Sequence, residues 1–142
     1  MNANKTICLS LMLLLVLSNL YGQRTLVLDR NGKQFGKGSV ILNEETGIHP
    51  LPETLKIEDA KRLVKLVVLD KQSSPLSIVS YGVSIVDSPK VQKFSCDSSS
   101  FTFDLLNALK NLKRGTRIYF SNIDAKLDGG LVFSNELIFI VE

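Results

Sequence analysis

The sequence is poor in the residues that most often build catalytic and metal sites. Among its 142 residues there are no tryptophans, one histidine and two cysteines. A hydrolase triad needs a histidine beside a nucleophile. The one candidate, His49, lies in a loop between Ile48 and Pro50, where a structural histidine is the simpler interpretation. A zinc site needs three or four nitrogen, sulfur or oxygen ligands, more than this inventory provides at any recognisable spacing.

Other chemical motifs are also missing. Gly32, Gly36 and Gly38 do not have the spacing of a phosphate-binding loop. Two acidic pairs, Glu44–Glu45 and Glu58–Asp59, lie in polar stretches where solvated charge is the simpler interpretation. General acid–base catalysis needs positioned titratable groups, which this pattern does not assemble. We therefore predict that the chain is not an enzyme and holds no cofactor or metal.

The N-terminus has the layout of a secretory signal peptide. Lys5 gives a positive start, Ile7–Leu17 is an apolar run, and a more polar stretch after it ends at Gly22. We place cleavage between Gly22 and Gln23. An uncleaved membrane anchor is the alternative, but the 14 apolar-rich residues that end at Leu20 fall short of the ~20 needed to span a bilayer.

Cleavage would remove residues 1–22 and leave one exported, β-rich domain over residues 23–142, with no membrane span. Loss of Lys5 lowers the net charge from +3 to +2, which is too mild to indicate binding to nucleic acid or to an anionic membrane. Cys96 would be the one remaining cysteine, so no internal disulfide can form. It either joins two chains or stays a partly buried free thiol, the more common case.

The hydrophobic pattern predicts a mainly β (α+β) fold. Between Ile78 and Val86, apolar and small polar residues alternate, as in a strand with one buried face. Further strands are expected at Thr25–Leu28, Ser39–Leu42, Lys65–Leu69, Val91–Ser95, Arg117–Phe120 and Leu131–Val141, the last interrupted near Ser134–Asn135. Because few strands alternate with helices, the pattern favours an antiparallel β-sheet or sandwich over a parallel α/β fold.

One well-defined helix is predicted at about residues 103–113. Thr102 is a suitable N-cap, and Gly115 is expected to end the helix with a positive φ. A second, short helix is predicted at about residues 55–63, with Thr54 as its cap.

The main helix carries an apolar stripe of four leucines: Leu105, Leu106, Leu109 and Leu112. Such a stripe must pack on another surface. We expect Leu109 to be buried against the sheet, at Val79, Tyr81 or Val83. The alternative is an exposed docking face for a partner helix or strand.

Basic residues gather at the end of this helix: Lys110, Lys113, Arg114 and Arg117. One hypothesis is that Lys113, Arg114 and Arg117 dock on an acidic partner. The alternative is that they complement the helix dipole and are otherwise ordinary solvated charges.

The segment Lys113–Ala125, followed by Asp128–Gly130, resembles the end of the C-terminal domain of the gliding motility protein GldM. The layout before it is also similar, with an alternating strand over Val79–Ile85 and then a serine-rich loop and a capped helix over Ser98–Leu112. The resemblance covers about residues 50–142. Its motif residues look structural: Gly115, Ile118, Tyr119, Phe120, Asn122 and Ile123. Because Ile123 is out of phase with Ile118 and Phe120, we expect a bulge between them.

The resemblance implies a periplasmic domain of Bacteroidetes-type bacteria that works by contacting other proteins. GldM proteins link a proton-driven motor to gliding and type IX secretion. The sequence has no counterpart of their spanning helix, helical membrane-proximal domain or middle β domains, so the motor role is not carried over.

The leading hypothesis is a non-catalytic, exported protein-interaction domain, periplasmic or secreted, with another envelope protein as its partner. The alternative is a small-ligand or glycan-binding β module. That module would need exposed aromatic side chains, for which Tyr81 and Tyr119 are the candidates.

Overall fold

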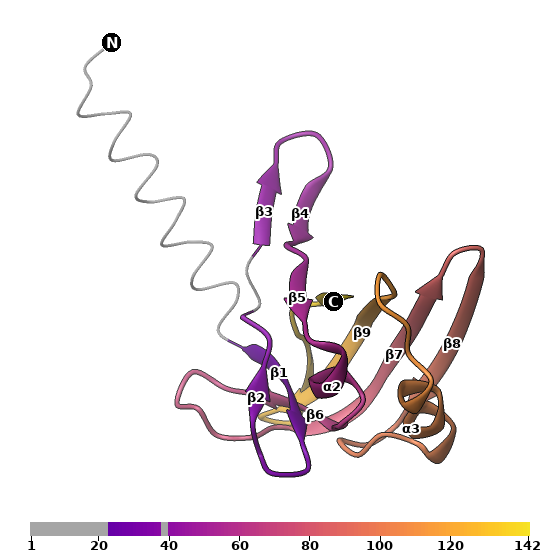
Figure 1. Cartoon of the computed structure of the whole chain (residues 1–142). Helices are drawn as coiled ribbons and strands as arrows, with labels where there is room; N and C mark the ends of the chain where they lie inside the picture. The colour runs from indigo at the N-terminus through magenta and orange to yellow at the C-terminus, as the bar shows by residue number, and fades with distance from the viewer. Residues whose placement is uncertain (1–22, 38–39) are drawn as a thin grey trace.

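Strands make up most of the structure, a computed structural model that describes residues 23–37 and 40–142 (Figure 1). The mainly β fold predicted from the sequence is confirmed. The predicted signal peptide, residues 1–22, lies outside the described residues. The elements, in chain order, are β1 (Arg24–Asp29), β2 (Gln34–Phe35), β3 (Val40–Asn43), β4 (Gly47–Pro50), β5 (Glu53–Leu55), α2 (Ile57–Ala60), β6 (Leu63–Leu69), β7 (Ser77–Asp87), β8 (Lys90–Cys96), α3 (Phe103–Lys110), β9 (Arg117–Leu127), β10 (Gly130–Phe133) and β11 (Leu137–Val141).

The described strands form two main sheets and a separate hairpin. The smaller sheet has the order β2-β1-β6, and the larger has the order β5-β11-β9-β7-β8. In the larger sheet β10 also pairs with β9, beyond the stretch of β9 that pairs with β11. The β3–β4 hairpin projects away from both sheets (Figure 1). Every described strand pair is antiparallel except β5–β11, which is parallel. The short strands β4 and β5 were not predicted from the sequence.

Both sheets and α3 contribute to one continuous hydrophobic core. The smaller sheet supplies Val27 and Leu66, while the larger supplies Val83, Phe120 and further side chains from β7, β9 and β11. A line of aromatic rings runs through this core: Tyr81, Phe101, Phe120 and Phe139, with successive centroids 6.4, 5.8 and 6.0 Å apart. Shared burial of this kind is what makes a sandwich-like fold cooperative.

A serine-rich segment joins the two sheets. The Leu66 amide donates to the Ser99 carbonyl at 2.9 Å, and the Phe101 amide donates to the Val64 carbonyl at 2.8 Å. The Ser99 hydroxyl donates back to the Leu66 carbonyl at 2.7 Å. This segment therefore pairs with the edge of β6 that β1 leaves open.

The main helix, α3, begins as predicted and ends earlier. The Thr102 hydroxyl accepts from the Leu105 amide at 3.3 Å, which confirms the N-cap. The helix ends at Lys110 rather than near residue 113, with Asn111 as its C-cap. The Leu112 amide donates to the Leu109 carbonyl at 3.4 Å, a tightened final turn, and the chain then turns toward β9.

Gly115 has the predicted positive φ of 87°, but it does not cap the helix. It lies inside a later turn, which the Thr116 amide closes by donating to the Lys113 carbonyl at 3.2 Å. The Gly115 amide donates to the Val141 carbonyl at 2.7 Å, which fixes the start of β9 beside β11.

The short helix α2 is confirmed, although it has only four residues. The predicted cap at Thr54 is wrong because Thr54 belongs to β5 and Lys56 occupies the N-cap position. Pairing of β5 with β11 holds Thr54 in a strand, so tertiary context overrides its local capping preference.

The leucine stripe of α3 faces the core. Leu105 and Leu109 are fully buried and Leu112 is 7% exposed, which confirms the core interpretation over an exposed docking face. On β7 the alternation holds at Tyr81 and Val83 but not at Val79. A register shift lies between Ile78 and Ser80, and it is Ile78 that packs against the core.

We expect Leu109→Ala to lower the free energy of unfolding by about 2–5 kcal/mol, because the substitution empties a fully buried site. Leu131→Ala is the matched control, since Leu131 is 59% exposed and the same atoms are removed. Urea denaturation of both variants tests this. Equal effects would contradict the assignment of Leu109 to the core.

We expect Gly115→Val to cost about 1 kcal/mol or more, because a β-branched residue resists positive φ. No atom lies within 4 Å of an added Cβ, so backbone strain rather than a clash sets this cost. Gly115→Asn should cost less because asparagine tolerates the left-handed region. Equal urea midpoints for both variants would contradict this account.

Candidate interaction surfaces

Except for Gly115 in the preceding turn, the motif residues that resemble GldM occupy structural positions on β9. Ile118, Phe120 and Ile123 are all buried at 1% exposure or less. The expected bulge is confirmed: Gly82 of β7 pairs with Ser121, but Ser80 pairs with Asp124, so Asn122 and Ile123 lie opposite Tyr81 alone and β9 has one extra residue. This extra residue lets side chains on both sides of the bulge face the same core.

The two other motif residues on β9 are Asn122, which lies in this bulge, and Tyr119. Asn122 is exposed and adopts a φ of 51°, the left-handed conformation that lets β9 bend. Tyr119 is half-buried on the opposite face of the strand from its buried neighbours. None of these positions presents a reactive group.

The predicted docking residues lie on and just after the turn that precedes β9. Lys113, Arg114 and Arg117 are all exposed. The Lys113 ammonium lies 3.8 Å from a carboxylate oxygen of Asp87 on β7, and the lysine side chain is 78% exposed. A surface pair of this kind contributes little to stability. The turn therefore presents its positive charge mainly to solvent.

Lys110 belongs to a different surface, which we call the basic hollow. This hollow has a volume of about 360 Å³ and is lined by Asp29, Arg30, Asn31, Lys61, Arg62 and Lys110. A second hollow of about 210 Å³ adjoins it and shares Arg30, Lys61 and Lys110. This hollow was not predicted from the sequence, because its cations come from three segments that are far apart in the chain.

The strand β10 presents an apolar edge. Among the described strands β10 pairs only with β9. Leu131 is 59% exposed and Phe133 is 78% exposed on this strand, while Val132 between them packs against the core. The edge strand β8 of the same sheet carries Lys90 and Lys93, charges that discourage strand addition. The edge of β10 has no such charge.

Tyr81 and Cys96 form the most buried titratable pair among the described residues. Tyr81 is 2% exposed, and its hydroxyl donates to the Ser99 carbonyl at 3.1 Å. Burial, and then the neighbouring Cys96, raise the pKa of the Tyr81 phenol well above its usual range. Cys96 is a free thiol that is 3% exposed, so its sulfur faces the core rather than solvent.

Other candidate residues do not converge on a reactive site. His49 lies in β4 rather than in the predicted loop, because it pairs with Ile41 of β3; it is exposed, and its ring nitrogen lies 2.7 Å from the Thr46 hydroxyl. Over residues 23–37 and 40–142, no three histidine, cysteine or acidic side chains are grouped so that they could hold a metal ion. Within the same ranges, no helix has the length and apolar character needed to cross a membrane.

Comparisons with known sequences give no family for this chain. No protein-family model matches it, and no curated protein matches it. The likeness to the GldM C-terminal domain therefore stays a prediction from the motif itself.

We expect the stability of the protein to fall as the pH rises above about 10, because the unfolded chain then ionises a phenol that the folded chain keeps protonated. The folded state binds more protons in this window, so alkaline conditions favour unfolding. Tyr81→Phe should remove this part of the pH dependence and cost ~1 kcal/mol at neutral pH through loss of the hydrogen bond to Ser99. Urea denaturation on both sides of pH 10 tests this; identical pH slopes for the variant and the wild type would contradict it.

Proposed function

We propose that this chain is a non-catalytic, exported protein-interaction domain of the GldM C-terminal type. In this proposal it works in the periplasm or after secretion, and its partner is another protein of the cell envelope. It serves as an accessory to cell-envelope, gliding or type IX secretion machinery. The signal-peptide pattern of residues 1–22 and the motif over Lys113–Ala125 support the location and the class.

The apolar edge of β10 is the observation that carries the proposal. An unprotected strand edge is a template for pairing with a second polypeptide. Its exposed Leu131 and Phe133 give such a contact apolar area to bury. By contrast, the glycan-binding alternative rested on Tyr81 and Tyr119, of which the first is buried and the second half-buried.

The test is photocrosslinking in cells of the source bacterium, with a benzophenone amino acid in place of Phe133. We expect this position to crosslink to one specific envelope protein, because the side chain is 78% exposed on an open edge. The same amino acid in place of Val91, which is 54% exposed on the lysine-bearing edge β8, is the matched control.

Different outcomes separate the alternatives. A specific crosslink from Val91 but not from Phe133 would keep the interaction role and move it to another surface. Absence of protein crosslinks from both positions, together with retention of the purified protein on a glycan array, would favour the glycan-binding module.

A further inference from the structure

Four cationic side chains converge on the basic hollow from separate parts of the fold. Arg30 lies in the turn after β1, Lys61 and Arg62 follow α2, and Lys110 is the last residue of α3. All four are exposed. Since they surround a recess of about 360 Å³, their fields add within it, where a bound anion would be partly shielded from solvent.

Among the residues that the structure describes, none forms an ion pair with any of these four cations. The ion pairs that the described residues form are Lys33–Asp59 and Lys113–Asp87. The one acid that lines the hollow, Asp29, is 6% exposed. One of its oxygens accepts from the Asn31 and Lys33 amides at 2.8 and 2.9 Å, so this carboxylate stabilises the turn after β1. The hollow therefore keeps an excess of positive charge.

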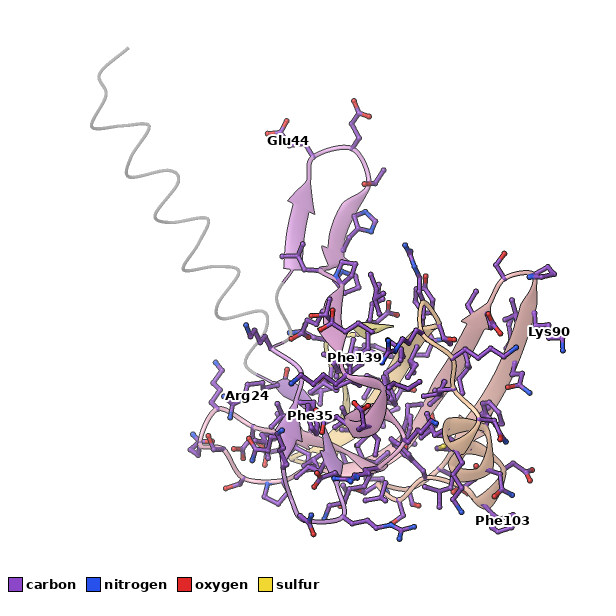
Figure 2. All side chains as sticks on the ribbon, viewed as in Figure 1. Arg24, Phe35, Glu44, Lys90, Phe103 and Phe139 are labelled. Carbon is purple, nitrogen blue, oxygen red and sulfur yellow. The ribbon has the colours of Figure 1, made fainter. Side chains whose placement is uncertain are left out.

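An apolar wall continues the hollow on one side. The adjoining recess is lined by Leu63, Val64, Phe103 and Leu106 in addition to shared cations. Phe103 is 75% exposed and extends outward from the first turn of α3 (Figure 2). The site thus combines several separated positive charges with an aromatic ring and aliphatic side chains.

We propose that the basic hollow binds an acidic segment of a partner protein. Carboxylates of the segment lie against Arg30, Lys61, Arg62 and Lys110, and an apolar side chain of the segment packs on Phe103. This inference rests on the proposed function, because it assigns a surface and a chemistry to the partner. A free phosphate ion would leave the apolar wall unused, and a flat membrane surface would not enter the recess.

The test measures fluorescence anisotropy of a labelled eight-residue peptide of aspartate and glutamate with one central phenylalanine. The protein for this assay is produced from the full chain and then purified. We expect the double variant Arg62→Glu/Lys110→Glu to weaken binding by about tenfold or more. The matched control is Lys113→Glu/Arg114→Glu, which changes the net charge equally on the neighbouring turn and should change affinity less than about twofold. Arg62→Gln/Lys110→Gln replaces the first variant if charge reversal lowers its unfolding midpoint.

Further outcomes overturn the inference. Absence of peptide binding to the wild type, or equal losses in both charge variants, would exclude the hollow as the site. Full competition by equimolar inorganic phosphate would identify a small-anion site instead. Binding to vesicles of phosphatidylglycerol but not to the peptide would identify a membrane contact. A peptide with serine in place of phenylalanine should bind more weakly, and equal affinity would contradict the role of Phe103.

The same variants used in cells separate this inference from the proposed function. If the Phe133 crosslink persists in Arg62→Glu/Lys110→Glu and the peptide assay is also unchanged, the acidic-segment inference fails and the interaction role stands. If the wild type gives no protein crosslink at all, the interaction role fails.

Discussion

The pairing of Ser99–Phe101 with the open edge of β6 holds the two sheets together. Its backbone hydrogen bonds to Val64 and Leu66 satisfy donors and acceptors that the β1–β6 pair leaves free. The Ser99 carbonyl also accepts from the Tyr81 hydroxyl, which belongs to the larger sheet. One short segment therefore joins β6, β7 and the start of α3, and the core can close around Phe101.

The positions of α3 and of the basic hollow depend on this pairing with β6. Because the segment pairs with β6 and runs directly into the Thr102 cap, α3 begins beside the smaller sheet. Lys61 and Arg62 immediately precede β6, so the same pairing brings them near the end of α3. The basic hollow thus depends on core geometry, although none of its cations is buried.

Features set by local signals could be predicted from the sequence. The alternation of β7 and the cap at Thr102 each depend on residues within one element. The strand β5 and the basic hollow could not be predicted, because β5 exists through pairing with β11 at the other end of the chain. Gly115 shows both cases: its positive φ follows from residue type, but its role in the turn depends on its hydrogen bond to Val141.

The early end of α3 explains why one basic cluster in the sequence becomes two surfaces in the fold. On a continuous helix, Lys110 and Lys113 would lie on the same face at i, i+3 spacing. Because the helix ends at Lys110, Lys113 lies on the next turn and reaches Asp87 on β7 instead. Lys110 instead lies with the cations that follow β1 and α2, beside the apolar wall near Phe103. In general, a recessed, partly apolar surface can distinguish ligands by shape as well as by charge, whereas an exposed charged turn can do so mainly by charge.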